Sequence, residues 1–242
     1  DYYIANTGSY SASFLNITAG PLTNGSDIDG GVIVSAEVKS AAFTTAPDFD
    51  AWRFTGTNGD RILISAANTS AGARNTTTYV YPPNGGAPVV ASAADRSDYQ
   101  LLATGTYTIV IEDSGLNDNG AYNLSFLNVT AGPLNNGADP DGGPIASSEW
   151  ESGQMQLVGD FDAFSFSATA GDRIVFGTVV TSGTFESNLT LYPPGGGAAV
   201  VNTYTGDRLD AQLAQTGTYT VVIEDYYIAN TGSYSASFLN IT

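Results

Sequence analysis

Carboxylates are the side chains of this sequence whose types and spacing are best suited to chemistry. Two D-x-D pairs, Asp48/Asp50 and Asp160/Asp162, each stand at the start of an expected strand. Alternation along a strand points both carboxylates of a pair to the same face. Such pairs suit acid–base catalysis, as in glycoside hydrolysis, or the binding of a hard cation. Asp also caps strands and turns, which gives each pair a purely structural alternative.

Two glycine-rich loops add further carboxylates. The segments NGSDIDGG at 24–31 and NNGADPDGG at 135–143 repeat the same acidic pattern. Hard cations take several oxygen ligands from flexible loops, so calcium is the one cofactor that we predict. The loops lack the spacing and the closing Glu of an EF-hand, and a solvated Asp-Gly turn is the alternative. The predicted calcium ligands are Asp27, Asp29, Asp48, Asp50, Asp139, Asp141, Asp160 and Asp162.

Composition excludes most catalytic machinery. The 242 residues include no His and no Cys, which excludes Ser-His-Asp and Cys-His systems and the zinc sites built on them. We therefore predict that the chain is not an enzyme. The 24 acidic and 7 basic residues give a net charge of −17, which excludes nucleic acid as a partner because no basic patch displaces counterions. No apolar run approaches the roughly 20 residues of a membrane span.

Asparagine and arginine both recur in patterned positions. Eight N-x-[ST] sequons predict N-linked glycans, while the general abundance of Asn and Thr on β surfaces is the alternative. The sequons are at Asn16, Asn24, Asn68, Asn75, Asn123, Asn128, Asn188 and Asn240. The recurring Asp-Arg dipeptides are Asp60-Arg61, Asp95-Arg96, Asp172-Arg173 and Asp207-Arg208. We expect the dipeptides to form structural ion pairs that fix loops between sheets; an anion or glycan contact is the alternative.

An internal repeat places these residues in matched positions. TGTYTIVIED at 104–113 recurs as TGTYTVVIED at 216–225, an offset of 112 residues. The same offset relates DFDAWRF at 48–54 to DFDAFSF at 160–166. Repeats of this length are the signature of tandem modules.

Strand signals are dense within each repeat, and amphipathic helical spacing is absent. Tyr107, Ile109 and Ile111 alternate with Thr and Val, and turn formers separate the short apolar runs. About eight strands per module predict an all-β chain of two tandem jelly-roll or Ig-like β-sandwiches of about 112 residues each. Phe14 is followed by a change of hydrophobic phase at Leu15, which predicts a β-bulge.

Five motifs in order resemble the bacterial pre-peptidase C-terminal domain. They are the DFDAFSF strand, the AGDRI turn, LTLYPP, TGTYTVVIED and the closing GSYSASF strand, all within 160–238. The resemblance implies a β-sandwich accessory domain, usually non-catalytic, within secreted proteins, and calcium dependence in some members. Because the G-x-Y-x-L strand ends that family's pattern, it implies modules at 19–130 and 131–242. Residues 1–18 then form a terminal strand that must dock on a neighbour.

The two ends of the chain carry the same sequence. Residues 1–18 are identical to 225–242, whereas 113–130 differs from both at ten positions. One interpretation is a segment of a longer A-B-A-B polypeptide, consistent with a start at Asp1 without an initiator Met. The other is that neighbouring chains exchange the strand head to tail. Both imply a linear polymer.

We therefore predict a structural protein of an extracellular fibre or surface stalk, whose partners are copies of itself and glycans. The alternative is a carbohydrate- or protein-binding accessory module of a secreted hydrolase or adhesin. The residues expected to mediate assembly are Tyr10, Phe14, Leu15 and Ile17 at one end and Tyr234, Phe238, Leu239 and Ile241 at the other.

Overall fold

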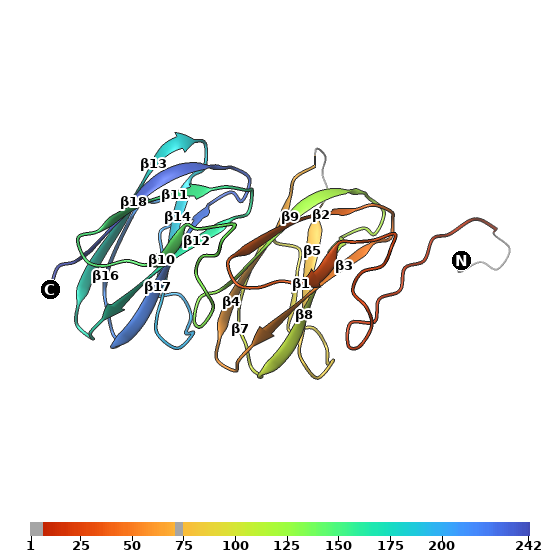
Figure 1. Ribbon diagram of the computed structural model, residues 1–242, viewed down its shortest axis with the longest axis horizontal. Coiled ribbons are helices and arrows are strands. Elements are labelled where there is room, and N and C mark those ends of the chain that lie inside the picture. Colours follow the sequence, from red (N-terminus) through yellow and green to blue (C-terminus); the bar gives the residue numbers. More distant parts are fainter. Residues whose placement is uncertain (1–6, 71–74) are drawn as a thin grey trace.

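The computed structural model describes residues 7–70 and 75–242, which form 18 strands and no helix. The strands make four sheets that pair into two β-sandwich modules of the same topology. Figure 1 shows the modules side by side, with the C-terminus and the N-terminal segment at opposite ends of the molecule. The predicted fold class is therefore confirmed. Among the described residues, nothing has the helical length and apolar character needed to cross a membrane.

The described residues of module 1 form nine strands where about eight were predicted, and among them only the β1–β3 pairing is parallel. Its five-stranded sheet contains, in spatial order, β1 (Gly30–Val32), β3 (Phe49–Gly56), β8 (Gly105–Asp113), β5 (Thr76–Tyr81) and β6 (Val90–Ser92). Its four-stranded sheet contains β2 (Glu37–Phe43), β9 (Gly120–Asn128), β4 (Arg61–Asn68) and β7 (Arg96–Gln100).

Module 2 repeats this arrangement strand for strand. Its five-stranded sheet contains β10 (Gly142–Pro144), β12 (Phe161–Ala168), β17 (Gly217–Asp225), β14 (Ser187–Tyr192) and β15 (Val201–Asn202). Its four-stranded sheet contains β11 (Trp150–Met155), β18 (Gly232–Asn240), β13 (Arg173–Gly183) and β16 (Arg208–Gln212). The last strand of each module, β9 or β18, lies inside its sheet between two antiparallel neighbours.

The core of each module lies between its two sheets because inward-facing apolar residues alternate along the long strands. In module 1, Trp52 pairs with Ile109 across β3 and β8, and Ile64 pairs with Phe126 across β4 and β9. All four side chains belong to one buried cluster, and the equivalent positions build the core of module 2. The period-2 pattern of the sequence thus fixes which face of each strand turns inwards.

The change of phase after Phe14 does not mark a β-bulge, so that prediction is wrong. Residues 7–16 form no strand, and β9 keeps a continuous register through the equivalent position. Phe126 of β9 faces the core of module 1, whereas Leu127 and Val129 belong to a different buried cluster. The phase changes because one strand contributes to two buried surfaces.

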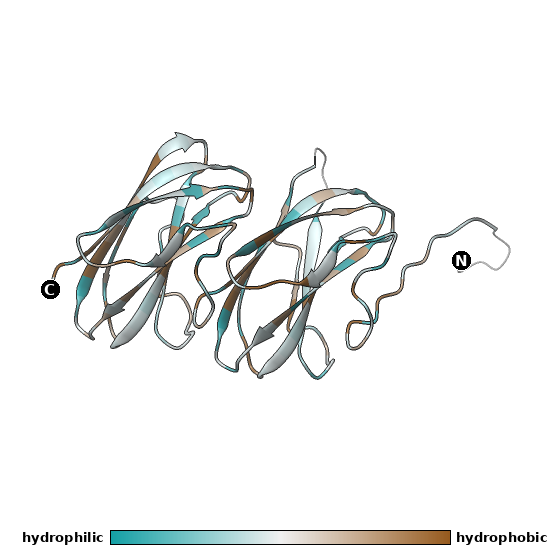
Figure 2. Cartoon of the chain, viewed as in Figure 1, coloured by the Kyte–Doolittle hydropathy of each residue, from teal (hydrophilic) through white to brown (hydrophobic). Residues whose placement is uncertain are grey.

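The N-terminal segment keeps the pattern of a strand without being one. Residues 7–14 extend away from module 1 in Figure 1, and Figure 2 shows hydrophobic and hydrophilic residues interspersed along the N-terminal part of the chain. Tyr10 and Phe14 are each 91% exposed, whereas the identical Tyr234 and Phe238 of β18 are 1% and 3% exposed. One sequence is therefore a core strand at one end of the molecule and an unpaired segment at the other.

Candidate functional site: the module junction and two carboxylate clusters

The two modules meet in a buried junction. We call the outer face of each five-stranded sheet the head face and the outer face of each four-stranded sheet the tail face. The tail face of module 1 packs against the head face of module 2. The buried residues of this contact are Ala36, Leu63, Leu127 and Val129 of module 1 and Phe161, Ala163, Tyr192 and Val222 of module 2. Removing these side chains from water holds the two sandwiches together.

An ionic cluster adds specificity to the junction. Arg96 Nε donates to Glu224 Oε2 at 2.7 Å, and Arg96 Nη2 donates to the Tyr192 hydroxyl at 2.9 Å. Tyr192 donates to Asp98 Oδ2 at 2.8 Å, and Arg61 Nε lies 2.6 Å from Asp98 Oδ1. Burial raises the pKa of Glu224, and the positive charge of Arg96 opposes that rise. Since an unpaired buried carboxylate is strongly destabilising, Arg96 fixes how the modules face each other.

The arginines of the Asp-Arg dipeptides do form ion pairs, with partners other than the adjacent Asp. Each arginine pairs with an aspartate that lies either two residues after it or on a neighbouring strand. Arg96 also pairs with Glu224 of the other module. Glu224 and Tyr192 were not among the residues predicted from the sequence. The available signal was that both side chains face outwards on strands whose alternate side chains line the core. The observed pairs are Arg61–Asp98, Arg96–Asp98, Arg96–Glu224, Arg173–Asp210 and Arg208–Asp210.

Residues 15–22 lie on the head face of module 1 as residues 127–134 lie on the head face of module 2. The carbonyl of Ile17 accepts a hydrogen bond from Thr108 Oγ1 at 3.1 Å, and the equivalent bond in the junction measures 2.9 Å. The apolar contacts on this head face involve Leu15, Ile17, Leu22, Phe49, Ala51, Tyr79, Tyr81 and Val110. The N-terminal segment thus occupies the position that the end of a preceding module would occupy.

The residues predicted to mediate assembly fall into four environments. Tyr234 and Phe238 lie in the core of module 2, whereas Leu239 and Ile241 are 43% and 52% exposed on its tail face. The equivalent residues at the other end are Tyr10 and Phe14, which are exposed, and Leu15 and Ile17, which pack on the head face of module 1.

Two equivalent carboxylate clusters lie where the glycine-rich loops meet the D-x-D strands. Within each cluster, one carboxylate oxygen from every member lies within 4.8 Å of the others. The clusters consist of Asp27, Asp48 and Asp50 in module 1 and Asp139, Asp160 and Asp162 in module 2. A set made only of carboxylate oxygens is the donor set that hard cations prefer.

Several carboxylate oxygens of the two clusters are buried without a hydrogen-bond partner among the described residues. Asp50 and Asp162 are both 0% exposed, and Oδ2 of each accepts a hydrogen bond from Tyr122 or Tyr234 at 2.7 Å. Within the described residues, Oδ1 of Asp50 and of Asp162 and both oxygens of Asp139 have no partner. Unsatisfied buried carboxylate oxygens are costly unless a proton or a cation neutralises them, so these residues fit a hard cation.

The electrostatics of the clusters agree with this geometry. Burial raises the pKa of Asp50 to about 8 and the pKa of Asp139 to about 7, with further increases from the neighbouring carboxylates. Burial also raises the pKa of Asp162, which faces the charges of Asp160 and Asp139. Each cluster therefore holds protons near neutral pH unless a cation replaces them.

Two of the eight predicted calcium ligands lie outside the clusters. Asp29 Oδ2 accepts a hydrogen bond from the backbone N–H of Ala42 at 2.9 Å, and Asp141 Oδ2 accepts one from Gln154 at 2.9 Å. These bonds tie each loop to the strand beside it. Asp48 also accepts backbone hydrogen bonds at the start of β3, as its capping role requires.

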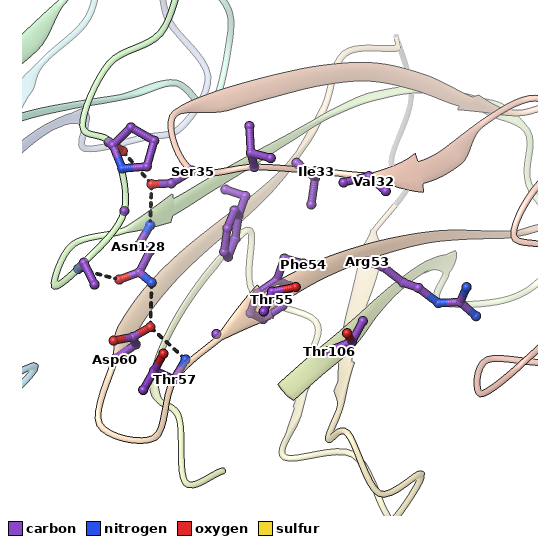
Figure 3. Close-up of a pocket in the computed structure, with 16 residues that line it drawn as sticks. Val32, Ile33, Ser35, Arg53, Phe54, Thr55, Thr57, Asp60, Thr106 and Asn128 are labelled. Carbon is purple, nitrogen blue, oxygen red and sulfur yellow. Dashed lines mark hydrogen bonds between the residues drawn. The ribbon is translucent and has the colours of Figure 1, made fainter. Parts of the chain in front are cut away.

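The sequons differ in accessibility. Asn16, Asn24 and Asn75 are exposed, and Asn68 and Asn240 are partly exposed. Figure 3 shows Asn128 in the wall of a pocket, where its Nδ2 donates to Asp60 Oδ2 at 2.9 Å. Asn123 and Asn188 are also buried, with Nδ2 donating to the Val158 carbonyl and to Glu224 Oε1. A glycan would attach to Nδ2, which is hydrogen-bonded in the folded chain at Asn123, Asn128 and Asn188. Glycosylation of the sequons stays a prediction.

No family model and no curated protein matches this chain, whereas several solved structures do. A periplasmic inhibitor of g-type lysozyme, PliG of Salmonella Typhimurium, is 17% identical over 41% of this chain and 97% of its own, with a TM-score of 0.34. The pre-peptidase C-terminal domain of collagenase from Bacillus anthracis, which represents the family that the sequence motifs resemble, is 14% identical over 40% of this chain and 94% of its own, with a TM-score of 0.35. The CBM22 tandem of Paenibacillus barcinonensis Xyn10C is 11% identical over 86% of this chain and 84% of its own, with a TM-score of 0.26.

Proposed function

We propose that this chain is a non-catalytic structural unit of an extracellular fibre or surface stalk, in which modules follow one another head to tail. Copies are joined by donation of residues 8–16 to the preceding copy. One observation carries this proposal: residues 15–22 already hold the position of a module end on the head face, while residues 7–14 stay unpaired.

Donation requires that the segment fit the neighbour without change, and its sequence meets this requirement. Residues 8–16 are identical to β18, which pairs with β11 and β13. In the place of β18, Phe14 would fill the core position of Phe238. Tyr10 would donate to Asp162 as Tyr234 does at 2.7 Å. Because residues 15–22 remain on their own head face, the new contact between copies repeats the internal junction.

The driving force for assembly lies in the junction and not in the strand. Replacing β18 by an identical strand leaves the contacts within module 2 unchanged, so the exchange of strands changes the free energy very little. The gain is the burial of the rest of the module 2 tail face against the head face of the next copy, at about 25 cal/mol per Å² of apolar area. Leu15 and Ile17, which already pack on that head face, would stand where Leu239 and Ile241 stood. An A-B-A-B polypeptide would form the same junction covalently.

We further propose that each carboxylate cluster binds one calcium ion. In module 2 the ligands would come from Asp139, Asp160 and Asp162, and in module 1 from Asp27, Asp48 and Asp50. The unpartnered buried oxygens support this assignment. The cation would neutralise the cluster and stiffen the loop that enters each head face, which suits a load-bearing array.

Electron microscopy and sedimentation of the full chain without denaturant test the proposal, with the chain 19–242 as the matched control. We expect filaments from the full chain and monodisperse particles from the control, because only the full chain carries a donor. Calcium chelation should fray the filaments. Monodisperse particles from the full chain over a wide concentration range would overturn the fibre. The accessory-module alternative would then be tested with glycan and matrix-protein arrays.

A further inference from the structure

The two ends of the molecule carry the separated halves of the internal ionic cluster. On the tail face of module 2, Arg173 and Arg208 both pair with Asp210, at 2.8 and 3.1 Å. Their side chains are 52% and 65% exposed. Equivalent residues in module 1 are Arg61, Arg96 and Asp98, which form the same arrangement on the tail face that module 2 covers.

The head face of module 1 carries the complementary half. In the junction the tail-face arginines meet Glu224 and Tyr192. At the outer head face the equivalent residues are Glu112 and Tyr81. Glu112 Oε1 accepts a hydrogen bond from the Tyr79 hydroxyl at 3.2 Å, and its pKa is raised by burial. Glu112 takes part in no ion pair among the described residues.

We infer that the tail face of module 2 docks on the head face of module 1 of a second copy, with Arg208 paired to Glu112 and Asp210 accepting from Tyr81. This inference rests on the proposed fibre and names the contacts that select the next copy and set its orientation. Arg173 takes the position over the Tyr81 ring that Arg61 holds over Tyr192, where its guanidinium carbon lies 5.7 Å from the ring centroid.

Charge explains why this contact would be specific. A chain with a net charge of −17 repels its own copies at most orientations. Two of its 7 basic residues stand together on the tail face of module 2. Placing them against Glu112 gives attraction in a single orientation, and any other approach brings acidic surfaces together.

The apolar surroundings of the cluster match as well. Leu127 and Val129 flank the internal cluster and are 0% and 5% exposed. Leu239 and Ile241 stand at the equivalent positions of the free tail face. Val110 and Ala51 on the head face correspond to Val222 and Ala163, which receive Leu127 and Val129 in the junction. Leu15 and Ile17 already pack there, so the donated segment, in the place of Leu239 and Ile241, supplies this apolar part of the contact.

Charge-reversal variants test this docking contact independently of whether the chain forms a fibre. They can do so because each copy carries one half of the ionic cluster at each end. In Arg208→Glu alone, two carboxylates would face each other at every contact between copies. In Glu112→Arg alone, two guanidinium groups would face each other. In an equimolar mixture of the two variants, an alternating polymer pairs opposite charges at every contact. Neither substitution touches the internal junction, and circular dichroism checks that both variants fold.

We expect each variant alone to need at least about 100-fold more protein than the wild type to form filaments, and the mixture to form them near the wild-type concentration. Sedimentation velocity and electron microscopy measure both. Filaments from either folded variant alone at the wild-type concentration would overturn this docking while leaving the fibre intact. So would a mixture of two folded variants that stays monomeric. A wild-type chain that never assembles would overturn the fibre and the docking together.

Discussion

The two tail faces of this molecule are nearly the same surface in two situations. Leu127 and Val129 on module 1 are buried, while the equivalent Leu239 and Ile241 on module 2 are half exposed. Arg96 has a side chain that is 23% exposed and pairs with a carboxylate of the other module, whereas Arg208 is 65% exposed. The difference is that module 2 covers the tail face of module 1, whereas no second module lies on the tail face of module 2 among the described residues.

The comparison is sharpest between Phe14 and Phe238, which are the same residue in identical segments. Phe238→Asp should prevent module 2 from folding, because it buries an unpaired carboxylate in the core. Phe14→Asp should leave the stability of the monomer unchanged, since Phe14 is 91% exposed. It should nevertheless abolish filaments if residues 8–16 are donated. Thermal unfolding and electron microscopy measure the two effects, and normal filaments from Phe14→Asp would rule out donation.

A second matched pair is Arg96 and Arg208. Arg96→Ala leaves Glu224 buried without its cation, and we expect a loss of about 3 kcal/mol in the free energy of unfolding. Arg208→Ala removes an exposed ion pair and should change stability by less than about 0.5 kcal/mol. Urea denaturation of both variants in the monomeric state gives the comparison. Equal effects would mean that the junction is no more than a loose contact.

Leucine truncation tests the apolar part of the same contrast. Leu127→Ala removes a side chain that is 0% exposed and should destabilise the chain by about 2–3 kcal/mol. Leu239→Ala removes a side chain that is 43% exposed and should cost less than about 1 kcal/mol. The measurement is again the free energy of unfolding in urea. A large loss at Leu239 in dilute monomer would contradict the view that its face is uncovered.

The carboxylate clusters predict a smaller effect that depends on pH and calcium. The pKa of Asp50 is raised to about 8 and that of Asp139 to about 7, so the folded chain holds protons that the unfolded chain has released above about pH 4. In chelated buffer, stability should therefore fall as pH rises from about 4 to 8 and then level off.

Calcium should reverse this trend because it replaces the protons. At pH 8 we expect it to raise the melting temperature by about 5 °C, equivalent to a little over 1 kcal/mol, with a smaller rise at pH 5. Differential scanning calorimetry measures both, and Asp162→Asn serves as the variant with a weakened cluster in module 2. A melting temperature that ignores calcium at both pH values would mean that the clusters are proton-bound turns.

Local patterns were sufficient to predict the repeat and the sandwich. The alternation of Tyr107, Ile109 and Ile111 fixes one face of β8 inwards, because a strand with period 2 has one way to bury its apolar side. The recurrence of D-x-D and of the acidic loops predicted the positions of both carboxylate clusters. Which of those carboxylates converge was not predictable, because Asp27 and Asp50 meet only through the path of the loop.

The sequence by itself determined the β-sandwich modules, their number and the identity of the two ends, since these depend on periodicity and repetition. Only the tertiary structure decided what the outward-facing residues do. The change of phase at Leu15, whose equivalent is Leu127, predicted a bulge, and Arg96 predicted a loop ion pair. In the structure Leu127 is buried in the module junction, and Arg96 pairs with a carboxylate of the other module. The reason is that module 2 covers the tail face of module 1. Local sequence patterns within module 1 do not reveal that this face is buried, because its burial depends on how the two modules pack.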